Sequence, residues 1–183
     1  MERCSFFDKF IEQCSILWND GDAVVTRSEE IGLKILVINP GGTSTKIAVF
    51  ENEAQLFKAN IPHTAEDLQS FPHVFDQFGF RKQLILDELE KAGFSLDELA
   101  AVSGRGGLMN PIPGGTYTVN DQMVEDMRNA VHGEHPSNLG SVLAREIGDA
   151  LGIPSFVVDP VSVDELMPKA RISGIVDLER PSW

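Results

Sequence analysis

The chain has 183 residues, which is enough for one domain with a hydrophobic core. Its formal net charge of −13 argues against a nucleic-acid partner and against an anionic membrane surface, because phosphate groups would repel it. The two cysteines, Cys4 and Cys14, lie near the N-terminus, so we expect no disulfide framework and a reducing, cytoplasmic location. No apolar run approaches the ~20 residues that a membrane-spanning helix needs, and no signal-peptide pattern is present.

Residues 1–32 differ in pattern from the rest of the chain. Apolar side chains between Phe6 and Trp18 have the spacing of one short amphipathic helix, which the run Asn19-Asp20-Gly21-Asp22 would end. We expect an extension that is either a packed helix or weakly ordered, unless translation starts further along the chain. Residues 33–183 then form one domain.

The segment from Ile35 to Phe50 predicts two strands joined by a glycine turn. Two apolar runs flank the sequence Asn39-Pro40-Gly41-Gly42-Thr43-Ser44-Thr45-Lys46. Adjacent glycines permit positive φ and a close approach of the backbone, and successive N–H groups in such a turn can bind an anion. The hydroxyls and Lys46 add donors. A phosphate site is therefore one interpretation, and an ordinary hairpin with a solvated lysine is the other.

The remaining elements predict an α/β fold with a mixed sheet. A third strand near Gln55–Ile61 would extend the hairpin into an antiparallel meander. Further along, the pattern predicts helices over 77–92, 121–131 and 138–151, and strands over 99–103, 117–119 and 155–158. Because a strand, a helix and a strand follow one another, we expect part of the sheet to be parallel.

Polar residues follow two of these predicted strands at their carboxyl ends, where ligands bind in open α/β sheets. Arg105 stands within Gly104-Arg105-Gly106-Gly107. Its forked guanidinium suits a carboxylate or a phosphate, although a surface arginine in a flexible turn would give the same pattern. Asp159 follows the strand at 155–158 and precedes Pro160, which fits either a catalytic carboxylate or a structural turn.

Three of these motifs resemble those of butyrate kinases and occur in the same order. They are the hairpin Asn39–Lys46, the loop Gly104–Gly107 and the segment PIPGGTY at 111–117. Butyrate kinases belong to the acetate kinase family, within the superfamily of acetate and sugar kinases, Hsc70 and actin. The resemblance covers residues 34–183 and implies an actin-like ATPase (ribonuclease H-like) domain with a mixed five-stranded sheet flanked by helices. The family usually has serine where this chain has Gly42, so one hydroxyl donor is missing here.

The resemblance also implies roles for single residues. Phosphate would be held by Asn39, Gly41, Thr43, Ser44 and Lys46, with Asn39 also near magnesium. Arg105 would neutralise the developing negative charge, and Asp159 would orient the carboxylate or the metal. His135 and Asn138 match a His…Asn pair that lines the acyl-phosphate site of the family. Both of these residues also suit a helix-capping role.

The implied reaction transfers a phosphoryl group between ATP and butyrate, giving ADP and butyryl phosphate. The implied cofactors are ATP or ADP and magnesium, and the implied substrate is a short-chain carboxylate or acyl phosphate. The family pattern continues beyond Trp183 into a second domain, so we expect this chain to be incomplete on its own. It would self-associate or pair with that domain. Two alternatives remain open: a non-catalytic fragment, and a kinase for acetate, propionate or a branched short-chain acid.

Overall fold

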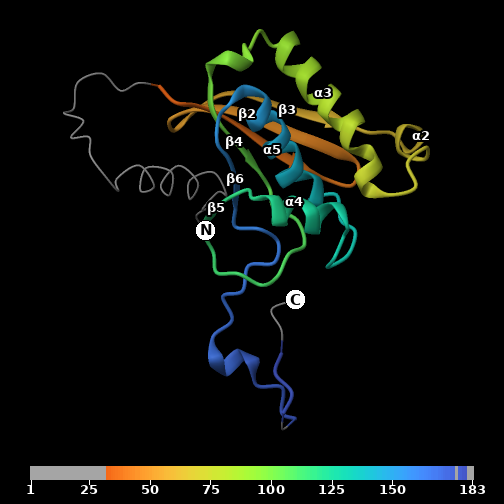
Figure 1. The fold of residues 1–183 in the computed structure, drawn as a ribbon, viewed down its shortest axis with the longest axis vertical. Coiled ribbons are helices and arrows are strands. Elements are labelled where there is room, and N and C mark those ends of the chain that lie inside the picture. The colour runs from red at the N-terminus through yellow and green to blue at the C-terminus, as the bar shows by residue number, and fades with distance from the viewer. Residues whose placement is uncertain (1–31, 176, 181–183) are drawn as a thin grey trace, which may run out of the picture.

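The computed structural model describes residues 32–175 and 177–180, which form one mixed sheet with helices packed against it (Figure 1). The strands are β1 (Lys34–Pro40), β2 (Ser44–Glu51), β3 (Ala54–Pro62), β4 (Leu99–Gly104), β5 (Thr116–Thr118) and β6 (Ser155–Val158). The helices are α2 (Ala65–Leu68), α3 (Phe78–Lys91), α4 (Asp121–Arg128) and α5 (Asn138–Leu151). Short 3₁₀ turns lie at η1 (Val74–Gln77), η2 (Leu96–Glu98) and η3 (Pro168–Arg171).

The strand order is β3-β2-β1-β4-β6-β5, with an antiparallel half and a parallel half. Strands β1, β2 and β3 form the predicted meander, and β1, β4 and β6 run parallel to one another. The predicted count of five strands is wrong, because the described sheet has six. Strand β5 returns along the edge of β6 and pairs with it antiparallel, with Tyr117 opposite Val157.

The core follows from the alternation of side chains along the central strands. Leu36 and Ile38 of β1 pack with the buried side chains of α3 and α5 in the main cluster. Ile35 and Val37 alternate with them and belong to a second cluster on the opposite face of the sheet. In Figure 1, α3 and α5 lie across the same face of the sheet. This packing fixes where the carboxyl ends of the parallel strands lie.

Helix α5 approaches the end of β4 unusually closely. A Cβ atom added at Gly104 would lie 2.0 Å from the Gly140 carbonyl oxygen, and one added at Gly140 would lie 2.0 Å from the Arg105 carbonyl oxygen. No side chain fits in that space, so both positions require glycine. The start of α5 is thereby fixed against the loop that carries Arg105.

Helix α4 ends earlier than predicted. It begins after Asn120, whose side chain accepts a hydrogen bond from Met123 N at 2.8 Å, as expected for an N-cap. The helix stops at Arg128, because Ala130 adopts a left-handed φ of 49°. Val131, which was predicted to be helical, is 59% exposed. The predicted N-terminal extension, residues 1–32, lies almost entirely outside the described residues. Within the described part of the chain, no helix has the length and apolarity needed to cross a membrane.

Candidate functional site

The hairpin turn joins β1 to β2 at the carboxyl end of β1. Gly41 N donates a hydrogen bond to Ser44 O at 2.7 Å, which closes the turn. Neither Gly41 nor Gly42 adopts the positive φ that glycine permits. What glycine provides here is open space: a Cβ atom added at Gly42 would meet nothing within 4 Å. The turn is therefore open to solvent at Gly42.

The pleat of the hairpin divides its polar side chains between two faces. Asn39 lies directly opposite Lys46 in the register of β1 and β2, so these two side chains share a face. Ser44, two residues before Lys46, lies on that face as well. Thr45 points to the other face and is fully buried. The Lys46 side chain is exposed and forms no hydrogen bond or ion pair within the described residues.

The loop at Gly104–Gly107 links three parts of the site. Arg105 N donates to Ile38 O at 2.9 Å, which places the loop beside the end of β1. A Cβ atom at Gly106 would lie 2.7 Å from Pro160 Cβ, and one at Gly107 would lie 2.4 Å from Asn138 Oδ1. The Arg105 side chain is exposed and has no hydrogen-bond or ion-pair partner within residues 32–175 and 177–180. Its guanidinium is thus available to an anion.

Asp159 is held in a strained conformation directly after β6. Its φ of 41° is left-handed, which is uncommon outside glycine, although aspartate tolerates it better than most residues. Gly115 N donates to Asp159 Oδ1 at 2.8 Å, and Asp159 N donates back to Gly115 O at 3.0 Å. Such strain persists only where surrounding contacts impose it, and it is concentrated at functional sites.

His135 and Asn138 differ in how free their side chains are. His135 is exposed, and its Nδ1 accepts a hydrogen bond from Ser137 N at 3.2 Å, so the neutral ring carries its proton on Nε2. Asn138 is buried; its Oδ1 accepts from Leu108 N and its Nδ2 donates to Gly133 O, each at 2.9 Å. The Asn138 amide therefore ties two loops together. Ser137 is the N-cap residue of α5 but makes no capping hydrogen bond with its side chain.

The site residues predicted from the sequence thus fall at one edge of the sheet. The hairpin turn, Arg105 and Asp159 follow β1, β4 and β6 at their carboxyl ends, and His135 precedes α5 at the same edge. Lys46 and Arg105 bring two positive charges without a described partner to this edge. Asp159 brings a carboxylate held by backbone contacts. Such an arrangement can bind a phosphate or a carboxylate.

Sequence reasoning missed Arg81, which lies directly behind the hairpin turn. Its side chain is fully buried, with an exposure of 0%. One terminal nitrogen donates to Gly41 O at 2.9 Å and to Thr45 Oγ1 at 3.0 Å. The signal was present in the sequence, because Arg81 stands four residues before Ile85 and eight before Leu89 on the buried side of α3. This spacing predicts that Arg81 lies on the buried side of the helix, which is unusual for a charged residue.

His63 completes a buried network with these residues. Its Nε2 lies 2.8 Å from Thr45 Oγ1, and its other ring nitrogen forms no hydrogen bond of normal geometry. The His63 ring also meets Phe80 edge-on, at 5.6 Å between ring centroids. Burial, and secondarily the positive charge of Arg81, lowers the pKa of His63 below its ordinary value of 6.5. His63 is therefore held in its neutral form.

Acidification should destabilise the protein through His63. In the unfolded chain its pKa returns to the ordinary value of 6.5, so below that pH the unfolded state binds a proton that the folded state resists. The free energy of unfolding should therefore fall as the pH drops from 7 to 5. His63→Gln, which keeps a neutral polar group, should show a smaller fall in urea unfolding. An equal fall in both proteins would mean that another group is responsible.

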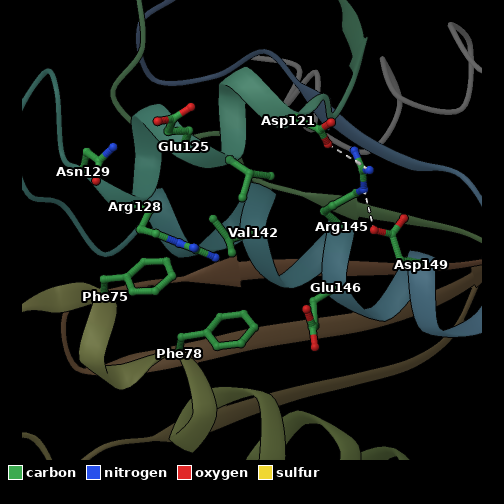
Figure 2. A pocket seen from close by; sticks show the side chains of 11 residues that line it. Phe75, Phe78, Asp121, Glu125, Arg128, Asn129, Val142, Arg145, Glu146 and Asp149 are labelled. Carbon is green, nitrogen blue, oxygen red and sulfur yellow. Dashed lines mark hydrogen bonds and ion pairs between the residues drawn. The ribbon is translucent and has the colours of Figure 1, made fainter.

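A hollow of about 610 Å³ is lined by none of the site residues predicted from the sequence. Figure 2 shows the side chains that line it, which come from α4, α5 and the residues around the start of α3. Arg145 bridges Asp121 and Asp149 at its rim, and Arg128 lies 5.2 Å from the centre of the Phe75 ring. Its cations are therefore already engaged by carboxylates or an aromatic face. We place the candidate site at the sheet edge, where Lys46 and Arg105 have no such partners within residues 32–175 and 177–180.

The donors at the sheet edge fit magnesium only as a metal that is shared with substrate. Among the described residues, no group of three or more His, Cys, Asp or Glu side chains is placed to hold a metal ion. Mg²⁺ is commonly bound by one or two protein oxygens together with phosphate oxygens and water. The amide oxygen of Asn39 and the carboxylate of Asp159 are of that kind. These residues suit a magnesium–nucleotide complex rather than a free ion.

Comparison with known proteins identifies relatives of this chain. Two proteins named probable butyrate kinase, from two strains of Clostridium botulinum, are each 52% identical to it over 149 residues. The match covers 81% of this chain and 42% of each relative, so the chain spans about two fifths of their length. The crystal structure of acetate kinase from Porphyromonas gingivalis matches with a TM-score of 0.51 and 16% identity, over 79% of this chain and 41% of that one. No protein-family profile matches.

These matches confirm two predictions made from the sequence. The resemblance to butyrate kinases is confirmed by relatives that share half of the aligned residues. The acetate kinase structure confirms the predicted fold class, apart from the number of strands. The roles of individual site residues stay predictions.

Proposed function

We propose, from this relationship to butyrate kinases, that the described domain forms the phosphate-binding and acid-binding part of a short-chain carboxylate kinase. The reaction transfers the γ-phosphoryl group of ATP to butyrate and yields ADP and butyryl phosphate. The observation that supports this most is the meeting of Lys46, Arg105 and Asp159 at one sheet edge, with both cations free of described partners. Butyrate is the proposed acid because the relatives carry that name.

The proposed roles follow from the chemistry of each group. The backbone of the turn and Lys46 bind phosphate oxygens, and the Arg105 fork binds two oxygens of the transferred group. Asp159 orients the reacting carboxylate or the magnesium, with Asn39 as a second oxygen donor. The exposed Nε2–H of His135 donates a hydrogen bond to the phosphoryl group. Asn138 acts as a positioning residue, because its amide holds the loops on either side of it.

This division of work suits phosphoryl transfer. Little covalent chemistry falls to the protein, and the rate depends on positioning and on stabilising charge. Bound ATP with magnesium would supply the phosphoryl group and neutralise part of its charge. The chain spans about two fifths of the length of its relatives. The activity of the whole enzyme therefore stays a prediction. So do a homo-oligomer or a pairing with a second domain, and a cytoplasmic location. Acetate, propionate and branched acids are alternative substrates, and an inactive fragment is the other alternative.

Ligand titration of the 183-residue chain tests this proposal. Butyryl phosphate should shift the amide NMR signals of the hairpin turn and of the Gly104–Gly107 loop. Neutral butyramide, which lacks the phosphoryl group, should leave both unchanged. If butyryl phosphate shifts neither segment of the folded chain, the sheet edge is not an acyl-phosphate site.

A further inference from the structure

Arg81 carries a buried charge without a counter-charge among the residues that the structure describes. Its side chain is fully buried, yet all of its described hydrogen bonds go to neutral acceptors. Burial lowers the pKa of Arg81, and no carboxylate in the described part of the chain opposes the effect. Buried charges are normally paired with an opposite charge, because their desolvation is costly. Arg81 is therefore an exception among buried charges.

Gln77, a neutral residue, occupies the position at which a carboxylate could neutralise Arg81. Its Oε1 accepts from Arg81 Nε at 3.0 Å and from the second terminal nitrogen at 2.8 Å. Arginine usually makes this kind of contact, through two of its nitrogens, with a carboxylate. Glutamate would fit the same position and cancel the charge. With glutamine there, the guanidinium is held in place and its charge is retained.

The retained charge lies behind the turn that we propose to bind phosphate. The Gly41 carbonyl accepts from Arg81 on the helix side of the sheet, whereas Asn39 and Lys46 occupy the opposite face. Thr45 accepts from the same nitrogen and contacts His63, so the turn is fixed from behind at two points. Being fully buried, Arg81 cannot touch a ligand; it acts through the turn.

We propose that Arg81 is a positioning residue for the anion site: it fixes the Gly41–Thr45 segment and supplies an uncompensated positive charge beneath it. This inference rests on the proposed phosphate-binding role of the hairpin. A buried charge is screened by salt far less than an exposed one, so it strengthens anion binding at physiological ionic strength. Gln77 is then a positioning residue as well, because it orients the guanidinium without neutralising it.

Gln77→Glu separates the charge of Arg81 from its structural role. The new carboxylate would keep both hydrogen bonds, so the thermal midpoint should stay the same or rise. The dissociation constant for inorganic phosphate, followed through the amide signals of Gly41 to Lys46, should increase about tenfold because the positive charge is cancelled. A purely structural role for Arg81 would leave phosphate affinity unchanged.

Gln83→Glu is the matched control. It makes the same change of charge on the same helix, but Gln83 is exposed and contacts Asp87. We expect less than a twofold change in phosphate affinity. If both variants bind phosphate as the wild type does, the inference is overturned while the proposed function stands. If the wild type shows no phosphate shift in the hairpin at all, both fail together.

Thr45→Val gives a second test that does not depend on burying a carboxylate. It removes the hydroxyl that accepts from Arg81 and leaves the shape of the side chain nearly unchanged. We expect phosphate to bind about threefold more weakly, because the turn loses one of its two fixed points. Unchanged affinity in Thr45→Val would contradict the fixing role.

Discussion

Gly140→Ala should lower the free energy of unfolding by about 3 kcal/mol or more, among the larger effects expected of a single methyl group. The added Cβ would lie 2.0 Å from the Arg105 carbonyl oxygen, which is far inside contact distance. The backbone cannot shift easily at either residue. Gly140 lies within α5, and Arg105 is held by the hydrogen bond from its N to Ile38 O. Urea unfolding of the two proteins measures the difference.

Gly79→Ala is the matched control for this substitution. Gly79 also lies in a helix, but a Cβ atom there would meet nothing within 4 Å. Alanine should therefore stabilise the protein by about 0.5 kcal/mol through its higher helix propensity. If Gly140→Ala were as stable as the wild type, α5 and the Arg105 loop would not be packed as the structure shows.

Arg105→Gln should weaken the binding of butyryl phosphate by about 100-fold, because two charge-assisted hydrogen bonds are lost. The fold should be unaffected, since the Arg105 side chain is exposed and has no described partner. Arg105→Lys should recover only part of the affinity, because an ammonium group keeps the charge but not the fork. Isothermal titration of the three proteins provides the comparison.

Arg128→Gln serves as the control for loss of a positive charge. Arg128 lies against Phe75 in the hollow between the helices, which is lined by none of the predicted site residues (Figure 2). Its replacement should change the affinity for butyryl phosphate by less than twofold. Equal losses in Arg105→Gln and Arg128→Gln would show that only the net charge matters and that Arg105 makes no specific contact.

The elements that the sequence predicted best are those whose ends carry local signals. Helix α5 runs from Asn138 to Leu151, as its apolar period predicts, and Gly152 ends it with a left-handed φ of 68°. Helix α4 was predicted three residues too long, because Val131 continues the apolar pattern but lies after the left-handed Ala130. Strand β5 was predicted as a strand, but its pairing with β6 was not predicted. Its pairing with β6 is a long-range contact that no local pattern records.

The residue types and the location of the candidate site could be predicted from the sequence. The buried residues that hold the site in place could not. Arg105 and Asp159 stand after apolar strands, and the rule for open α/β sheets places them at one edge. The role of Gly140 could not be seen, because it depends on the distance between two backbones. Arg81 and His63 were missed since polar residues on a helix face or after a strand are usually solvated. Only the packed structure shows them buried behind the turn.

Phosphoryl transfer by a chimera tests the central claim most directly. The matching 149-residue segment of a Clostridium botulinum relative would be replaced by that of this chain, and hydroxylamine would trap butyryl phosphate made from ATP, magnesium and butyrate. We predict a rate within about tenfold of the parent enzyme, and a loss of about 1,000-fold with Asp159→Asn. Asparagine tolerates the left-handed backbone and keeps an oxygen that can accept from Gly115, while the charge is removed. A folded chimera that is inactive beside an active parent, or an Asp159→Asn chimera with an unchanged rate, would contradict the account.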